Sequence, residues 1–122
     1  MLNHAEIIGR LTQDPDVYRL NNNETVVNLK IETRESYTDR NGVRKELREW
    51  HAVSLYKSLA GIAAKYLKRG SRVYISGRLS TTSWKDAEGI KRSATAIKAD
   101  RLINLDHGDI KEESKDNQIN QI

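Results

Sequence analysis

The chain has 122 residues, enough for one domain with a modest core, and a hydrophobic content of 37%, low enough that part of it is not expected to pack. It contains no cysteine, which excludes disulfides and thiolate metal sites, and no apolar run near the roughly 18 residues of a membrane span. Residues 1–9 lack the basic and apolar pattern of a secretory signal, so we expect a cytoplasmic protein.

Charge is unevenly distributed along the chain. Residues 1–105 hold 19 basic and 12 acidic side chains, a net charge of +7, whereas residues 106–122 hold two basic and five acidic ones, a net charge of −3. The second segment is polar and has no apolar period, so we predict one domain at 1–105 followed by a disordered acidic tail at 106–122. A basic domain favours a polyanionic partner, although a merely solvated surface explains the same charge equally well.

The first half of the chain is predicted to consist of strands separated by turns. Residues 4–11 form an apolar first strand that Asp14-Pro15-Asp16 interrupts, and residues 17–20 can resume extended structure before the asparagine turn at 21–23. Residues 26–33 alternate between apolar and polar side chains, which is typical of a half-buried strand. The polar stretch 35–47 is expected to be an exposed hairpin or loop, and residues 49–56 form the next strand.

The second half begins with a change of period to that of an amphipathic helix. The apolar positions of this helix are Leu59, Ile62, Ala63, Tyr66 and Leu67. Ser58 is the expected cap, Gly70 is the expected end, and Tyr66 is expected in the core. Residues 71–79 and 92–105 are strands, with Val73, Ile75 and Leu79 on one face of the former. This order matches an all-β fold with one helix, namely an OB-fold: a five-stranded Greek-key barrel with the helix between strands 3 and 4. Other arrangements of an antiparallel meander of this size fit the same order.

Two aromatic residues of one predicted strand point away from its core face. Trp50 and Tyr56 are an even number of residues apart and share a face, while Val53 and Leu55 share the other. Aromatic rings beside positive charges offer unpaired nucleobases a stacking surface together with phosphate neutralisation. The predicted base-stacking residues are Tyr37, Trp50, Tyr56 and Trp84. The alternative for each of them is an ordinary place in the core.

Basic residues near these aromatics are the candidates for phosphate binding. They are Arg34, Arg48, Arg72, Arg78 and Lys85. Each base stacked on an aromatic ring contributes about 1–3 kcal/mol with little dependence on sequence, and phosphate contacts make binding weaken as salt rises. Most surface charge clusters are only solvated, which is the alternative for each of these five residues.

Six short segments occur in the order and spacing of a known family. They are Ile8-Gly9-Arg10-Leu11-Thr12-Gln13-Asp14-Pro15, Glu35-Ser36-Tyr37, Glu49-Trp50-His51, Lys65-Tyr66-Leu67-Lys68-Arg69-Gly70-Ser71, Val73-Tyr74-Ile75-Ser76-Gly77-Arg78-Leu79 and Ser83-Trp84-Lys85-Asp86. On these segments, residues 3–105 resemble the bacterial-type single-stranded DNA-binding protein family. The resemblance implies an OB-fold that binds single-stranded DNA in replication, recombination and repair, usually as a homotetramer, on the nucleoid of the bacterial cytoplasm.

The resemblance also implies roles for particular residues. Trp50 and Trp84 match the two stacking tryptophans of the family. Tyr56 stands where the family often has Phe, and Tyr37 where many members have a third Trp. His51 matches a position that the family uses at the subunit interface, and its parity places it on the strand face opposite to Trp50.

The chain departs from the family in two places. Many relatives carry basic residues just before the tryptophan at Trp84, and those positions are Ser80, Thr82 and Ser83 here. Phosphate contacts must therefore weaken at this point or come from other residues, such as Arg78 or Lys85. Residues 117–122 also lack the acidic tip ending in Pro-Phe that recruits replication and repair proteins, so the resemblance does not extend to docking through the tail.

No residue pattern favours catalysis. His51 has no cysteine and no second histidine at metal-ligand spacing, and the glycines form no phosphate loop. We therefore predict no enzymatic activity, no cofactor and no metal. Two alternatives to single-stranded DNA binding stay open. One is an OB-fold accessory protein of replication restart or RNA binding, and the other is a module whose exposed aromatics form a protein–protein interface.

Overall fold

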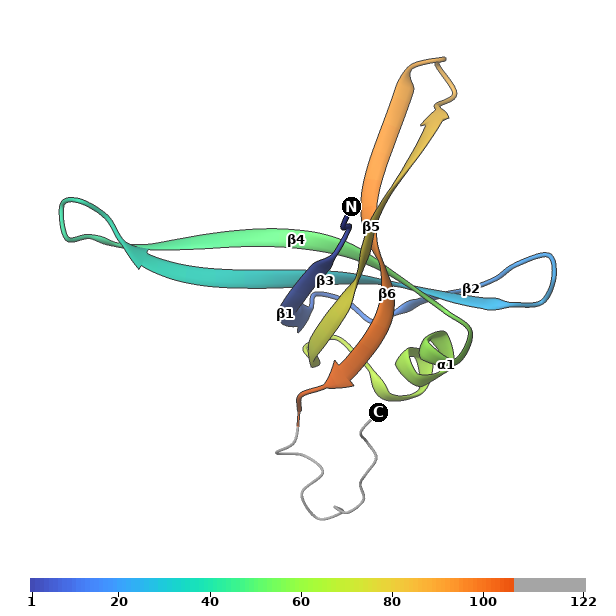
Figure 1. Cartoon of the computed structure of the whole chain (residues 1–122), viewed down its shortest axis with the longest axis horizontal. Helices are drawn as coiled ribbons and strands as arrows, with labels where there is room; N and C mark the ends of the chain where they lie inside the picture. The colour runs from blue at the N-terminus through green and yellow to red at the C-terminus, as the bar shows by residue number, and fades with distance from the viewer. Residues whose placement is uncertain (107–122) are drawn as a thin grey trace, which may run out of the picture.

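The computed structural model describes residues 1–106, in which six strands and one helix are found. The strands are β1 (Ala5–Leu11), β2 (Asp16–Arg19), β3 (Thr25–Thr38), β4 (Arg44–Tyr56), β5 (Arg72–Lys85) and β6 (Lys91–Asn104), and the helix is α1 (Lys57–Tyr66). The strands form one sheet in the order β1-β5-β6-β4-β3-β2, and a further pairing of β1 with β3 closes five of them into a barrel (Figure 1). The predicted tail at 106–122 falls outside the described residues apart from Asp106.

The barrel is the predicted OB-fold. It is closed by the antiparallel pair of β1 and β3, where Leu11 is opposite Ile31, and by the parallel pair of β4 and β6, where Val53 is opposite Ile97. The prediction that the helix lies between strands 3 and 4 is wrong, because α1 follows the fourth strand. The additional strand is β2, which pairs with residues 25–28 of β3 instead of leading directly into it.

Apolar side chains at alternate positions of the strands fill the barrel. Val27, Leu29 and Ile31 on β3 and Val53 and Leu55 on β4 are each at most 3% exposed, as their alternation predicts. Burying a side chain of this size contributes about 1.5–3 kcal/mol, which strongly favours the register that keeps them inside. The intervening residues of both strands are thereby fixed on the outside of the barrel.

The helix α1 is shorter than its sequence period suggests. It begins at Lys57, whose φ of 57° turns the chain out of β4, and it has no side-chain cap, so Ser58 is not the cap. It ends at Tyr66, after which Leu67 enters the core. Tyr66 is 57% exposed, so its predicted place in the core is wrong: the buried residues of α1 are Ala60 and Ala63, and its last residue stays on the surface. Ten residues are too few to cross a membrane, and residues 1–106 contain no other helix.

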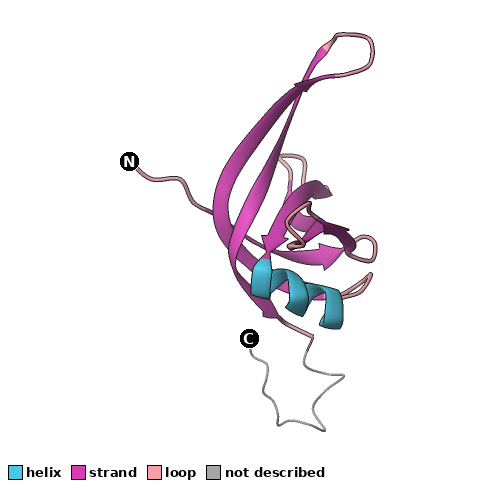
Figure 2. Ribbon diagram, turned by 90° about the vertical axis from the view of Figure 1, so that its right-hand side faces the viewer, coloured by secondary structure: helices cyan, strands magenta, loops and turns pink. Residues whose placement is uncertain are grey.

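Two long hairpins extend beyond the barrel as arms, one of β3 and β4 and one of β5 and β6 (Figure 1). Figure 2 shows the β5–β6 arm at the top, from the side. The polar stretch 35–47 is therefore a hairpin, with strands longer than predicted because polar residues continue the pairing where there is no core. Both arms end in the same turn. Asp39 and Asp86 each accept two backbone N–H groups through Oδ1 at 2.9–3.0 Å, and Gly42 and Gly89 take a φ of about 80° that favours glycine.

Candidate nucleic-acid interface

Three of the four predicted base-stacking residues lie open to solvent. The exposed fractions are 53% for Tyr37, 58% for Trp50 and 48% for Trp84, whereas Tyr56 is partly buried. A tryptophan or tyrosine gains stability mainly by burying its large ring, so these exposures do not fit the alternative of core residues. Their role in stacking remains a prediction, now with the rings accessible.

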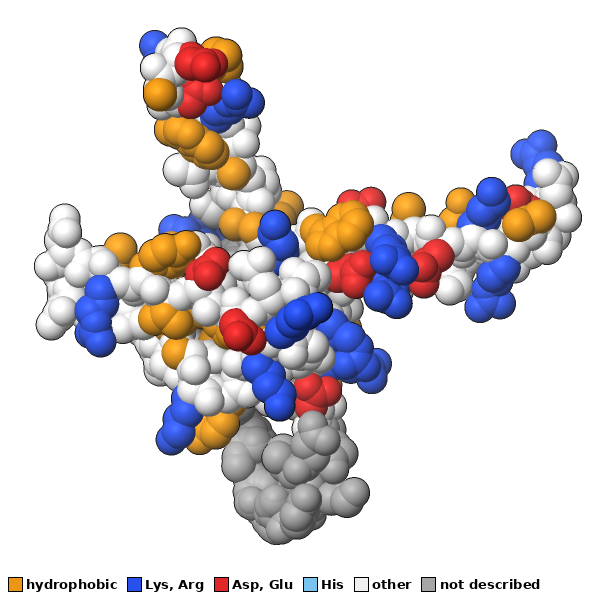
Figure 3. All heavy atoms as spheres, turned by 180° about the vertical axis from the view of Figure 1, so that it is seen from behind, with side chains coloured by type: hydrophobic (Ala, Val, Ile, Leu, Met, Phe, Trp, Pro, Cys, Tyr) orange, Lys and Arg blue, Asp and Glu red, His pale blue; other side chains and the backbone are white. Residues whose placement is uncertain are grey.

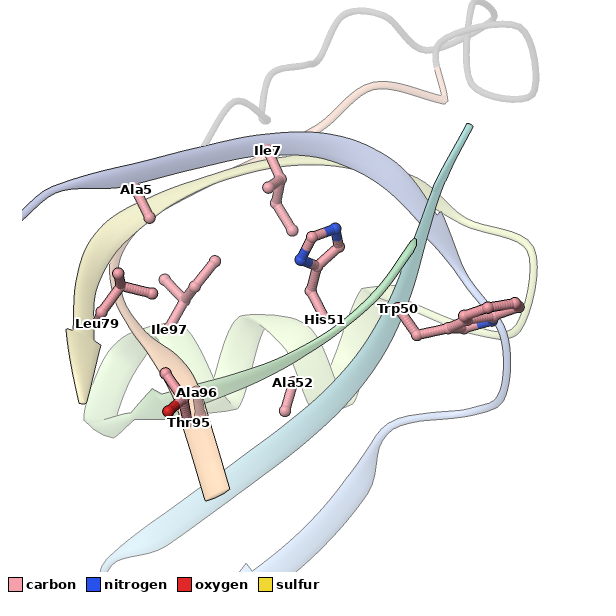
Figure 4. A pocket seen from close by; sticks show the side chains of 9 residues that line it. All are labelled: Ala5, Ile7, Trp50, His51, Ala52, Leu79, Thr95, Ala96 and Ile97. Carbon is pink, nitrogen blue, oxygen red and sulfur yellow. The ribbon is translucent and has the colours of Figure 1, made fainter. Parts of the chain in front are cut away.

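Trp50 and Tyr56 extend to the same side of β4, as their even spacing predicts. Trp50 is directly opposite Glu32, and Ala52 and Ser54 occupy the same side between the two rings. Both of these side chains are small, so they do not protrude between the two rings. In Figure 4 the Trp50 ring points away from the hollow that the neighbouring His51 enters, which shows the two faces of this strand directly.

Tyr37 and Trp50 lie on opposite faces of the β3–β4 arm because side chains alternate along each strand. Tyr37 is directly opposite Lys45, and Lys45 is an odd number of residues from Trp50 on β4. Side chains at odd separations lie on opposite faces, so Tyr37 and Trp50 extend from opposite faces of the β3–β4 arm. A single straight surface of one chain does not contain both rings.

Trp84 shares a face of the β5–β6 arm with two basic residues at its base. Arg78 is an even number of residues before Trp84 on β5, and its direct partner on β6 is Lys98. The ammonium nitrogen of Lys98 lies 5.4 Å from the centroid of the Tyr56 ring, which joins this face to that of β4. We call the combined surface of Trp50, Tyr56, Arg78, Trp84 and Lys98 the outer face. Lys85 directly follows Trp84 and therefore extends to the opposite side.

Two of the predicted phosphate-binding residues are already bound to carboxylates. Arg34 and Arg48 are directly opposite each other, and Glu32 lies beside both: its Oε1 is 3.3 Å from Arg34 Nε and its Oε2 is 3.6 Å from Arg48 Nη1. Glu46 Oε1 is 3.2 Å from Arg48 Nε. Figure 3 shows basic and acidic side chains adjoining along this arm. Both arginines therefore have carboxylate partners in the free protein.

Arg72 lies in a polar hollow of about 520 Å³ that sequence reasoning did not anticipate. The hollow is lined by Ile8, Gly9, Arg10, Glu32, Arg34 and Arg72. Arg10 is directly opposite both Glu32 and Arg72, on two different strands. Because Arg10 precedes the buried Leu11 on the same strand, alternation alone predicts that Arg10 lies on the outside of the barrel. Its position beside Glu32, however, depends on the closure of the barrel. Arg10 therefore joins the phosphate-binding candidates.

His51 faces a mainly apolar hollow of about 320 Å³, shown in Figure 4. Its Nε2 lies 2.9 Å from Thr33 Oγ1, and Ile7, Leu79 and Ile97 line the same hollow. Leu79 lies on the face of Val73 and Ile75 as predicted, but it is 48% exposed because the core ends before it. The subunit-interface role of His51 remains a prediction.

Hydrogen bonds shift the pKa values of three groups that are not among the predicted site residues. The Tyr74 hydroxyl donates to Glu6 Oε2 at 2.6 Å, which lowers the pKa of the Glu6 carboxyl and raises the pKa of the Tyr74 phenol. The Arg92 guanidinium, 3.0 Å from Asp86, and the backbone N–H of Ile90 lower the pKa of the Asp86 carboxyl. Glu6 is exposed, whereas Tyr74 and Asp86 are partly buried. Within residues 1–106 there is no cluster of three His, Cys, Asp or Glu that could hold a metal.

Comparisons with known proteins agree with this geometry. The sequence profile of the Single-strand binding protein family matches residues 2–105. Single-stranded DNA-binding proteins from Neisseria meningitidis serogroup A and serogroup B are each 43% identical to this chain over 101 residues. The matched region is 83% of this chain and 58% of each relative, so the chain spans little more than half the length of the curated relatives it matches.

Solved structures give the same result. A Plasmodium falciparum SSB in complex with ssDNA superposes with a TM-score of 0.80 at 34% identity, over 87% of this chain and 97% of that one. A deletion mutant of the single-stranded DNA binding protein from Thermus aquaticus superposes with a TM-score of 0.76 at 27% identity, over 85% of this chain and 50% of that one.

Proposed function

Because the chain belongs to the single-strand binding protein family, we propose that it binds single-stranded DNA with little preference for sequence. The observation that carries this proposal is the outer face, where Trp50 and Trp84 are exposed beside basic residues instead of packed in the core. The similarity to the Plasmodium falciparum SSB, which was solved in complex with ssDNA, supports the same ligand.

Binding of this kind combines stacking with charge neutralisation. Each base stacked on Tyr37, Trp50, Tyr56 or Trp84 would contribute about 1–3 kcal/mol, and every base has a face that can stack. Phosphates bound by Lys and Arg add a term that weakens with salt. Paired bases are already stacked within a duplex, so the protein would bind only unpaired strands and keep them unpaired.

The biological role that follows is protection of exposed strands during replication, recombination and repair. We propose that it carries out this role in the cytoplasm, on nucleoid DNA. Such a role makes and breaks no covalent bond, and we propose no catalysis, cofactor or metal for it.

Assembly into a homotetramer is part of the proposal. The apolar hollow at His51 and the exposed Leu79 offer a surface that a second copy would cover. Over residues 5–9, β1 pairs only with β5, which leaves its other edge open along that stretch. Because Tyr37 and Trp50 extend from opposite faces of one arm, a DNA strand that reaches both must pass around the arm or between copies. Light scattering of the full chain measures the assembly directly.

The test of ligand choice is a competition series at low salt. Fluorescently labelled oligo(dT) is bound to the full chain and displaced by oligo(dC), a mixed-sequence DNA strand, oligo(rU) and a DNA duplex. We expect the single DNA strands to compete within about tenfold of one another, because stacking tolerates every base, and the duplex to compete far more weakly. Stronger competition by oligo(rU) would support the RNA-binding alternative, and absence of any binding would support the protein–protein alternative.

A further inference from the structure

One pair of like charges on the outer face has no acidic partner. Arg78 on β5 and Lys98 on β6 are directly opposite, so their side chains extend to the same side of the sheet. Within residues 1–106 neither forms an ion pair with a carboxylate, whereas Arg34, Arg48 and Arg92 all do. Like charges directly opposite each other destabilise a sheet, and an anion bound between them would remove that repulsion.

The backbone fixes Lys98 at this place. The parallel pairing of Ser54 with Lys98 sets β6 beside β4, and Gly77 lets β5 approach so closely that a Cβ there would collide with the carbonyl oxygen of Lys98. The nearby carboxylate on β6, Asp100, accepts a hydrogen bond from Ser76 at 3.1 Å. The ammonium group of Lys98 meets the Tyr56 ring and has no carboxylate partner in the described part of the chain.

The surface between this pair and Trp84 consists of small, uncharged side chains. On β5, Ser80 and Thr82 lie on the face of Arg78 and Trp84, and their partners on β6 are Ala96 and Ala94. A backbone that crosses these small side chains meets no obstruction. It also meets no cation until Arg92 opposite Trp84, and Arg92 is held by Asp86 at 3.0 Å.

We infer that Lys98 is a phosphate-binding residue that, together with Arg78, holds the DNA backbone where a strand passes from the Tyr56 ring toward Trp84. The inference rests on the proposed function. It supplies the charged phosphate contact that Ser80, Thr82 and Ser83 cannot make, because their side chains carry no positive charge. Lys98 escapes detection in the sequence because no aromatic lies near it along the chain, and only the pairing of β6 with β4 brings it to Tyr56.

A purely structural role of Lys98 is to cover the Tyr56 ring. The two roles differ in the salt dependence of binding, since on a single strand the logarithm of the affinity falls by roughly 0.7 per phosphate contact for each tenfold rise in salt. Loss of ring packing changes affinity without changing this slope.

The experiment measures oligo(dT) affinity of the full chain from low to high salt for the parent, Lys98→Gln and Lys98→Arg. Lys65→Gln is the matched control, because Lys65 also lies over a tyrosine ring, that of Tyr66 at 5.3 Å, but on the helix. We expect Lys98→Gln to lower the slope by about 0.7, which is about a fivefold smaller gain in affinity between 1 M and 0.1 M salt. Lys98→Arg and Lys65→Gln should keep the parent slope.

Two results would overturn the inference while leaving the proposed function intact. The first is that Lys98→Gln shows the same salt dependence of affinity as the parent. The second is that Lys65→Gln lowers this salt dependence as much as Lys98→Gln does, which would assign the effect to net charge. Failure of the parent itself to bind oligo(dT) at low salt would instead reject the proposed function. Thermal unfolding of each variant tests whether it is folded. If Lys98→Gln does not fold, Lys98→Met takes its place, because Met keeps an apolar stem over the Tyr56 ring without a charge and should lower the slope by the same amount.

Discussion

The two arms end in the same turn but differ in how their charges are satisfied. On the β3–β4 arm, Arg34 and Arg48 both lie within 3.6 Å of Glu32. At the base of the β5–β6 arm, Arg78 and Lys98 are directly opposite with no acidic partner among residues 1–106. A cation already paired with a carboxylate must give up that contact to bind phosphate, so it contributes less to affinity. Proximity to an aromatic residue therefore does not identify a phosphate-binding residue; the state of its charge must also be known.

The largest effect tests whether both arms take part in stacking. Trp50→Ala and Trp84→Ala should each weaken oligo(dT) binding by about 1–3 kcal/mol, or about 5- to 150-fold, because each removes one stacked base. The measurement is the dissociation constant at fixed salt. Tyr66→Ala is the control, an exposed aromatic on the helix, and should bind as the parent does. Normal binding by either tryptophan variant would remove its arm from the interface.

The next effect compares the two kinds of arginine directly. Arg78→Gln should lower the salt slope of oligo(dT) binding by about 0.7, whereas Arg34→Gln should lower it by less, because Glu32 already neutralises Arg34. Affinities measured at several salt concentrations give both slopes. A larger decrease in Arg34→Gln than in Arg78→Gln would reverse the comparison between the arms.

A smaller effect in the opposite direction is expected from Glu32→Gln. The amide keeps the size of the side chain but no longer neutralises Arg34, so the slope should rise by up to about 0.7 and low-salt affinity should increase by up to about fivefold. Arg48 gains less because Glu46 still holds it. The control is Glu88→Gln at the tip of the other arm, which removes one negative charge at a place far from Arg34 and Arg48. If it changes the slope equally, Glu32 has no special effect.

The smallest effect concerns the stability of the β5–β6 turn. The Arg92 guanidinium and backbone N–H groups lower the pKa of Asp86 from its ordinary value of 3.8. A carboxyl whose pKa is lowered by folding stabilises the fold when the pH is above its pKa in the unfolded chain. This stabilisation is lost as the pH falls through its pKa in the folded protein. Asp86→Asn keeps the Oδ1 acceptor of the turn but has no carboxyl to titrate. Its melting temperature should therefore fall slightly less than that of the parent between pH 7 and pH 3; parallel losses would contradict this assignment.

The sequence predicted those features that depend on local alternation. The opposite faces of Trp50 and His51 and the buried Val53 and Leu55 follow from apolar side chains at period two. The barrel was predicted from the order of the strands and the helix together with the family resemblance. The lengths of the arms could not be predicted in this way, since polar strands beyond the core carry no apolar period. The exposure of Tyr66 depended on where α1 ends, and helix ends are weakly encoded.

The charges of the interface were predicted less well than its rings. Arg34 and Arg48 were identified by their aromatic neighbours, but the role of Glu32 depends on the register of β3 against β4. Arg10 and Lys98 were missed because each is brought to the site by pairing between strands far apart in the sequence. Exposed aromatics can be recognised from one strand alone, whereas the partners of a charge require the closed barrel.

The measurement that tests the account most directly is intrinsic tryptophan fluorescence during titration of the full chain with oligo(dT) at several salt concentrations. We predict quenching that saturates and an affinity that falls as salt rises, since Trp50 and Trp84 stack on bases while Lys and Arg bind phosphates. Unchanged fluorescence with no binding at low salt would contradict the account and leave the exposed rings to a protein interface.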